Sequence, residues 1–303
     1  MLSTAPNGFR AEEHMGNSRR NHDNFPVASI LMPAYMRHPV RVVYRFARTA
    51  DDIADEGHAS PTERYNGIAG LRRELDAIKT GTLTATDSNL MRDLSRVIME
   101  YSLDIQWFYD LLASVEADIA FEQPMDLAEN LEYARLSANP IGRILLRLCN
   151  DDSPTNVALS DNICTALQLI DFWQDIETDW RDKGRIYIPR MHMVRFGVTQ
   201  DHLNRGIVDA RWKALMRFEV CVARDFMLSG APLTKRLKNH RFQLELQAIM
   251  AFGLRILDLI EKVDYDVFRA RPVLGWRDQL GIFSGIVIRA CLNRPGNRGG
   301  WLV

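Results

Sequence analysis

Residues 44–56, YRFARTADDIADE, decide the fold of this chain. Steps of four, three and four separate four of their side chains, which therefore share one narrow stripe of an α-helix: Tyr44, Arg48, Asp51 and Asp55. The remaining faces of this helix are mostly apolar, as expected of a buried helix. Because an unpaired buried carboxylate is very costly, the stripe must face a metal, a partner charge or a wet cavity.

A second acidic stripe lies in residues 167–180, LQLIDFWQDIETDW. Asp171, Asp175 and Asp179 follow one another at intervals of four, so they repel each other by about 0.2–0.5 kcal/mol per pair on a helix. Large apolar residues crowd the other faces. A single acidic run is usually a solvated face, but two such runs, both embedded in apolar sequence, favour a shared cation site.

The ion that suits such a site is Mg²⁺, which prefers oxygen ligands and is commonly held by one or two carboxylates together with substrate phosphates. Two stripes facing each other across a cavity would hold two or three Mg²⁺ ions and one diphosphate between them. Glycoside hydrolysis is disfavoured, because it needs one acid and one base. A di-iron bundle needs Glu-x-x-His, which the chain lacks.

Helical periodicity extends along most of the chain, and strand-like alternation is rare. We predict an all-α, single-domain helical bundle with a central cavity, preceded by a flexible tail at 1–24 and followed by a tail at 293–303. The predicted helices are 25–36, 39–56, 61–79, 87–101, 104–122, 126–137, 140–149, 157–180, 199–204, 207–229, 239–268 and 276–292. Pro39 is expected to start the second of them.

Composition narrows the class of protein. The 303 residues are 47% hydrophobic and 25% charged with a net charge of −1, so no nucleic-acid-binding surface is indicated. The four cysteines form no CxxC pair, and the polar N-terminus has no secretory signal, so we expect a cytoplasmic protein. Peripheral contact at the inner membrane, through residues 280–292, is the alternative.

The two stripes resemble the motifs of the squalene/phytoene synthase family, and the resemblance runs from about Asn24 to about Leu292. Arg48-x-x-Asp51-Asp52-x-x-Asp55 resembles the first aspartate motif. Asp175-x-x-x-Asp179, followed by the GRIYIP segment at 184–189, resembles the second motif and its flap. The resemblance implies an isoprenoid-synthase fold, an isoprenoid diphosphate substrate and Mg²⁺.

Within that family several segments of the chain resemble bacterial hydroxysqualene synthases of hopanoid pathways. The similarity lies in residues 24–29, 137–143, 172–175 and 265–272. Such enzymes ionise presqualene diphosphate, rearrange the cation and quench it with water. Relatives that condense two prenyl diphosphates usually carry arginine where this chain has Gln174, and Asp171 stands where the family usually has asparagine. Losing one cation would fit a site that handles one diphosphate.

These motifs assign an expected role to each candidate. The Mg²⁺ ligands are expected among Asp51, Asp52, Asp55, Asp171, Asp175 and Asp179, although Asp52 is turned away from Asp51 and could pair with an arginine instead. Diphosphate contacts are expected from Arg48, Lys183 and Arg185, with ion pairs to the aspartates as the alternative for the arginines.

Aromatic faces stabilise cations by about 0.5–2 kcal/mol, so tyrosines are expected around the reacting carbons. The candidates are Tyr44, Tyr133 and Tyr265, with ordinary core packing as the alternative. Ser137, Asn139 and Gln168 are candidates for holding the quenching water. Wall or core positions are expected for Phe25, Phe172, Trp173 and Phe268.

Three other functions stay open from the sequence. The first is a presqualene diphosphate or squalene synthase that condenses two farnesyl diphosphates, and the second is a phytoene synthase. The third is a catalytically inactive relative that acts as an assembly or binding protein, which the two intact acidic motifs disfavour. Upstream and downstream enzymes of squalene synthesis are conceivable partners.

Overall fold

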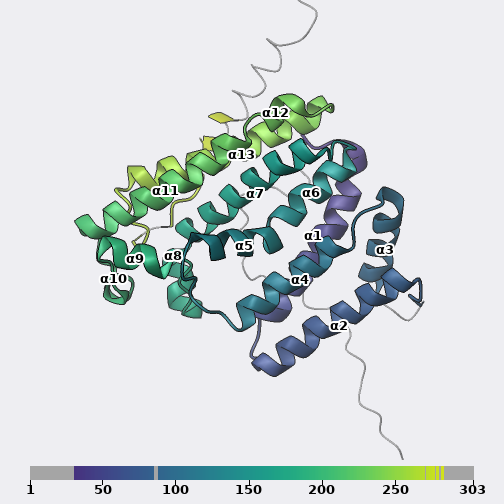
Figure 1. Ribbon diagram of the computed structural model, residues 1–303, viewed down its shortest axis with the longest axis horizontal. Helices are drawn as coiled ribbons and strands as arrows, with labels where there is room; N and C mark the ends of the chain where they lie inside the picture. The colour runs from purple at the N-terminus through teal and green to yellow at the C-terminus, as the bar shows by residue number, and fades with distance from the viewer. Residues whose placement is uncertain (1–30, 85–87, 270, 277, 280, 283–303) are drawn as a thin grey trace, which may run out of the picture.

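The computed structural model describes residues 31–84, 88–269, 271–276, 278–279 and 281–282. This part of the chain is helical and contains no strand, which confirms the all-α prediction (Figure 1). The elements are α1 Ala34–Asp55, α2 Pro61–Thr80, α3 Asn89–Tyr101, α4 Gln106–Ile119, α5 Leu127–Ser137, α6 Asn139–Leu148, α7 Pro154–Gln174, α8 Ile176–Thr178, the π-helical turn η1 Asp179–Lys183, α9 Arg190–Phe196, α10 Gln200–Arg205, α11 Ala210–Gly230, α12 Leu233–Arg236 and α13 His240–Lys262.

Helix α7 lies in the middle of the bundle (Figure 1). It packs most extensively against α11, and it also contacts α5, α6 and α13. Glycine allows the close approach of α11, because a Cβ at Gly230 would stand 2.7 Å from the carbonyl oxygen of Leu159 on α7. Helix α1 packs against α3 and α4. Buried residues of α1 and of α7 belong to the same hydrophobic core, so the two helices that carry the acidic stripes share one core.

Local sequence explains most helix starts. Ser60 and Glu63 form a reciprocal capping box at the start of α2, and Pro61 occupies the first turn. Ser153 caps α7 by accepting a hydrogen bond from the backbone N–H of Asn156 at 3.3 Å, with Pro154 next to it. The chain between α5 and α6 breaks at Ala138, just before Asn139 and Pro140, in agreement with the separate helices predicted at 126–137 and 140–149.

Three predicted boundaries are wrong. Pro39 lies inside α1 and does not begin a helix, since α1 starts at Ala34. The helix predicted at 157–180 ends at Gln174 and gives way to α8 and η1. The predicted helix at 239–268 ends at Lys262, because Asp264 and Tyr265 have φ values of 54° and 64°. Residues 25–30 and most of 276–292 lie outside the described residues.

None of the helices that the structure describes is long and apolar enough to cross a membrane. The sequence-based prediction also omitted two short helices, α9 and α12. Helix α9 matters for the site, because it follows the GRIYIP segment and anchors it. The backbone N–H of Arg190 donates to the Pro124 carbonyl at 2.8 Å, and that of Met191 donates to Met125 at 2.9 Å.

Candidate active site

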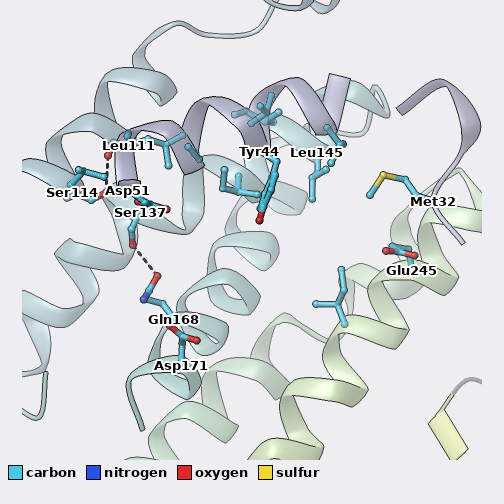
Figure 2. A pocket seen from close by; sticks show the side chains of 18 of the residues that line it. Met32, Tyr44, Asp51, Leu111, Ser114, Ser137, Leu145, Gln168, Asp171 and Glu245 are labelled. Atoms are coloured by element: carbon cyan, nitrogen blue, oxygen red, sulfur yellow. Dashed lines mark hydrogen bonds between the residues drawn. The ribbon is translucent and has the colours of Figure 1, made fainter. Parts of the chain in front are cut away.

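A cavity of about 500 Å³ opens between α1, α4, α5, α6, α7 and α13. Its wall is mainly apolar, with side chains such as Val43, Leu111, Ile144 and Phe252. Figure 2 shows Asp51 and Asp171 toward one end of this cavity and Glu245 with Met32 toward the other. The volume lies in the range of pockets that bind small molecules.

The carboxylates of Asp51 and Asp171 line the cavity and have strongly altered acidity. Both side chains line the cavity and are exposed to solvent, while the protein packed around them limits the hydration of their charges. Burial raises the pKa of Asp51 to about 6. Burial and the charges of Asp175 and Asp179 raise the pKa of Asp171 to about 7. Bringing a cation close would stabilise the charged form of both.

Asp55 connects the first stripe to the segment that follows the second. Its side chain accepts hydrogen bonds from Lys183, at the end of η1, and from Arg185 at 2.9 Å. Although burial would raise its pKa, these two cations hold the pKa of Asp55 below the ordinary value. Residues on α1 and residues about 130 positions later in the chain therefore meet at one place.

The second stripe keeps its turn spacing although α7 ends. The N–H of Asp175 donates to the carbonyl of Asp171 at 3.0 Å, and that of Asp179 donates to Asp175 at 2.8 Å. Burial raises the pKa of Asp179 to about 6. The following π-helical turn and Gly184, whose φ is 67°, then bring Lys183 back toward α1.

Arg271 is a cation at this site that the sequence analysis assigned no role. Its Nη2 donates to Asp175 Oδ2 at 3.0 Å, and its Nε donates to Oδ1 of the same carboxylate. The substitution of arginine by Gln174 therefore leaves the second stripe with an arginine from elsewhere in the chain. Whether the site has one cation fewer than in relatives that condense two diphosphates stays a prediction. No local pattern connects Arg271 with Asp175, which lies 96 positions away.

Asp118 is a further carboxylate that the sequence analysis missed. It accepts hydrogen bonds from the hydroxyls of Tyr133, at 2.7 Å, and Tyr187, at 3.1 Å. Burial raises its pKa, and its own charge in turn contributes to the raised pKa of Asp51. The sequence held a signal, since Leu111, Ser114 and Asp118 share one face of α4 and a carboxylate on a core face is costly.

The acidic residues could hold Mg²⁺ only together with further ligands such as phosphate and water. Within the residues that the structure describes, no three histidine, cysteine, aspartate or glutamate side chains are grouped so that they could hold one metal ion. Carboxylates with raised pKa values nevertheless come from both acidic stripes: Asp51 and Asp171 line the cavity, and Asp179 lies one helical turn or more beyond the lining residue Asp171. Such a donor set suits Mg²⁺ that takes its remaining ligands from phosphate and water.

Some predicted site residues lie elsewhere. Arg48 forms ion pairs with Asp52, at 2.8 Å, and Glu56, at 3.1 Å, and its side chain is 45% exposed. Neither Arg48 nor Asp52 is among the described residues that line the cavity. These ion pairs are the alternative that the spacing allowed, because the Arg48 and Asp52 side chains are one turn apart and turn toward solvent.

The predicted places of Asn139 and Tyr265 also differ, since neither is among the described residues of the cavity wall. Asn139 is buried and accepts a hydrogen bond from Thr165 at 3.3 Å. Tyr265 is buried near α11, where its carbonyl accepts from Trp212 Nε1 at 3.0 Å.

The cavity wall does contain Tyr44, Tyr133, Ser137 and Gln168. Ser137 Oγ lies 3.1 Å from Gln168 Oε1, a contact that Figure 2 draws as a dashed line. Asp171 lies one turn beyond Gln168 on α7.

The aromatic residues behind this wall form a packed cluster. Phe172 stacks on Tyr187 with 4.0 Å between ring centroids, and Trp173 is fully buried. Phe268 packs on Trp212 at 4.6 Å, away from the cavity. Phe25 lies outside the described residues.

An all-helical bundle with acidic stripes on either side of an apolar cavity defines the class of isoprenoid synthases. The chain belongs to the squalene/phytoene synthase family, whose sequence profile matches residues 18–278. It is 30% identical to a hydroxysqualene synthase of Rhodopseudomonas palustris over 84% of each chain. It is 28% identical to a 15-cis-phytoene synthase of Synechococcus elongatus, over 88% of this chain and 89% of the other.

A solved structure shares the same architecture. The crystal structure of a squalene synthase from Alicyclobacillus acidocaldarius superimposes with a TM-score of 0.72 and 28% identity, covering 79% of this chain and 88% of the other. This likeness confirms the predicted isoprenoid-synthase type of bundle.

Proposed function

We propose that this protein converts presqualene diphosphate into hydroxysqualene in an Mg²⁺-dependent reaction. The observation that carries the proposal is an enclosed apolar cavity with carboxylates of both acidic stripes at one end and a polar pair, Ser137 and Gln168, in its wall. An apolar wall of this kind suits a long hydrocarbon, and the acidic end suits its charged head group.

Each part of the site then has a task. Asp51, Asp55, Asp175 and Asp179, assisted by Asp171, would hold Mg²⁺, which neutralises the diphosphate and stabilises it as a leaving group. Lys183 and Arg185 lie on Asp55 and are placed to contact the same diphosphate. The positive charge left on the hydrocarbon would lie near the faces of Tyr44 and Tyr133, both in the cavity wall.

The last step is the addition of water to the carbon cation. Water must stay out until rearrangement is complete, because early addition gives a different alcohol. Ser137 and Gln168 offer hydroxyl and amide groups in a wall that is otherwise mostly apolar, and so they can hold one ordered water. The oxygen of that water forms the new C–O bond, one of its protons passes to the released diphosphate, and the product is the neutral alcohol.

The experiment supplies purified protein and Mg²⁺ with presqualene diphosphate, farnesyl diphosphate and geranylgeranyl diphosphate in separate reactions, in water enriched in ¹⁸O. We expect hydroxysqualene carrying the heavy oxygen from presqualene diphosphate alone. Turnover of farnesyl diphosphate with presqualene diphosphate left intact would refute the proposal.

The second candidate function is the condensation of two prenyl diphosphates, as in a phytoene synthase. The similarity to the Synechococcus elongatus phytoene synthase, which covers nearly nine tenths of both chains, favours it. The same experiment separates the two candidates, because phytoene contains no oxygen and would form from geranylgeranyl diphosphate. An Asp51→Asn or Asp175→Asn variant that folds yet releases no diphosphate would exclude the inactive assembly protein.

A further inference from the structure

Two neighbouring residues at the end of α7 bind two neighbouring residues from the C-terminal part of the chain. Gln174 is 1% exposed, and its side-chain amide donates to the carbonyl oxygen of Pro272. The carboxylate of the next residue, Asp175, accepts two hydrogen bonds from the Arg271 guanidinium, one from Nε and one from Nη2. The segment at 271–272 is therefore attached to the second acidic stripe through its backbone as well as through a side chain.

The carboxylates of this stripe attract the positive charge of Arg271. Its side chain and that of Asp175 are each only 18% exposed, so water screens their attraction incompletely. Asp171 and Asp179 also act on its charge. One guanidinium thus compensates three carboxylates that would otherwise repel each other at intervals of four residues.

Attraction alone does not fix the direction of the guanidinium. An arginine side chain has about 2 kcal/mol of rotamer entropy to lose, and its fork must meet both carboxylate oxygens in one plane. A bond from Gln174 to the adjacent Pro272 fixes the backbone from which the arginine extends. A carboxylate has about four lone-pair positions, so a fork that uses two leaves the others for a cation on the opposite side.

We propose that Gln174 is a positioning residue, which holds Pro272 so that Arg271 orients the Asp175 carboxylate for the Mg²⁺–diphosphate complex. The inference rests on the proposed function, because it assumes that Asp175 is a metal ligand. Outer hydrogen-bond partners of metal ligands typically change metal affinity or activity by about 10- to 100-fold when they are removed. Gln174 does not contact Asp175 but acts on it through Arg271, so the expected loss of metal affinity lies toward the lower end of that range.

The test is a double-mutant cycle that uses Gln174→Leu, Arg271→Met and the combined variant. Binding of inorganic diphosphate in the presence of Mg²⁺ is measured by calorimetry, together with the Mg²⁺ concentration that gives half-maximal binding. Gln174→Leu is expected to raise that concentration about 10-fold. Because Gln174 acts through Arg271, the combined variant is expected to bind no more weakly than Arg271→Met alone.

A matched control is Gln243→Leu, which removes another glutamine amide that donates to a backbone carbonyl, that of Leu237, near the start of α13. It should leave Mg²⁺–diphosphate binding unchanged. If Gln174→Leu does not fold, Gln174→Asn replaces it, since it keeps a buried amide but shortens its reach. Unchanged binding in the Gln174 variant, or effects that multiply in the combined variant, would overturn the proposal.

The wild-type measurement separates this inference from the function on which it rests. If the wild-type protein and the Gln174 variant bind Mg²⁺–diphosphate equally well, the positioning role is refuted. The proposed function still stands in that case. Wild-type protein that does not bind Mg²⁺–diphosphate overturns the metal site and the positioning role together.

Discussion

Replacing Asp171 by asparagine should stabilise the metal-free protein while weakening its response to Mg²⁺. Burial, followed by the charges of Asp175 and Asp179, raises the pKa of the Asp171 carboxyl to about 7. A carboxyl group whose pKa is higher in the folded than in the unfolded state stabilises the fold at low pH. That contribution is lost as the pH rises through the folded-state pKa. Above pH 7 the wild-type protein therefore carries an unfavourable charge that Asp171→Asn removes.

The magnitude follows from the distance between the two pKa values. The ordinary aspartate pKa is about 3.9, so the gap of about 3 pH units corresponds to about 4 kcal/mol as an upper bound. Solvent reaches Asp171 through the cavity, and screening by this water reduces the cost to about 1–2 kcal/mol. For a chain of this length that corresponds to a rise of about 2–3 °C in the melting temperature.

The assay is thermal unfolding of the wild-type and Asp171→Asn proteins, without metal, at pH 5 and pH 8. The variant is expected to melt higher at pH 8, and the difference should be smaller at pH 5, which lies between the ordinary aspartate pKa of about 3.9 and the raised pKa of Asp171 of about 7. Addition of Mg²⁺ and inorganic diphosphate should reverse the order at pH 8. Asp225→Asn, on an exposed face of α11, is the control and should change neither comparison. An Asp171→Asn variant less stable than wild type at pH 8 would refute the reasoning.

Other consequences follow from the same site. Because Mg²⁺ competes with protons for Asp51 and Asp179, whose pKa values are raised to about 6, the melting temperature should rise more with Mg²⁺ at pH 8 than at pH 5.5. Lys183→Gln should weaken Mg²⁺–diphosphate binding about 10-fold by calorimetry. The free energy of unfolding should change by less than about 1 kcal/mol, because the Lys183 side chain is 30% exposed. Phe172→Ala should cost about 3–5 kcal/mol in urea unfolding, since its ring is buried against Tyr187.

The acidic stripes could be predicted because a helix converts regular spacing into one face. Asp51 and Asp171 both lie in the cavity wall, and Asp55 is brought to the segment that follows Asp179. The same reasoning could not decide between solvent and cavity for Arg48. A side chain of that length can turn toward Asp52 one helical turn away or toward the cavity, and the ion pairs with Asp52 and Glu56 decide it.

The contacts that complete the site could not be predicted, because they join residues distant along the chain. Arg271 reaches Asp175 across 96 positions, and Tyr187 reaches Asp118 across 69. Neither contact leaves a local pattern in the sequence. Asp118 itself was detectable, since it lies on the core face of α4. Glu122 follows it at an interval of four, but α4 ends at Ile119, so the two do not form an acidic stripe on that helix.

Helix ends depended on backbone conformations that a periodic pattern does not contain. Regular apolar spacing continues past Gln174, but the helix changes to a π-helical turn at Asp179 and directs Lys183 to Asp55. The spacing also continues to Phe268, although left-handed residues at 264 and 265 end α13 early. The first difference brings Lys183 to Asp55, and the second leaves Tyr265 outside the cavity wall that the described residues form.

Locating the divalent ions themselves would show most directly whether the two helical stripes act together. Crystals grown with Mn²⁺ and inorganic diphosphate permit this, because anomalous scattering marks each ion. Our account predicts ions bridging the diphosphate to carboxylates of both α1 and the α7–η1 segment. Diphosphate bound without metal, or ions coordinated by one stripe alone, would contradict it.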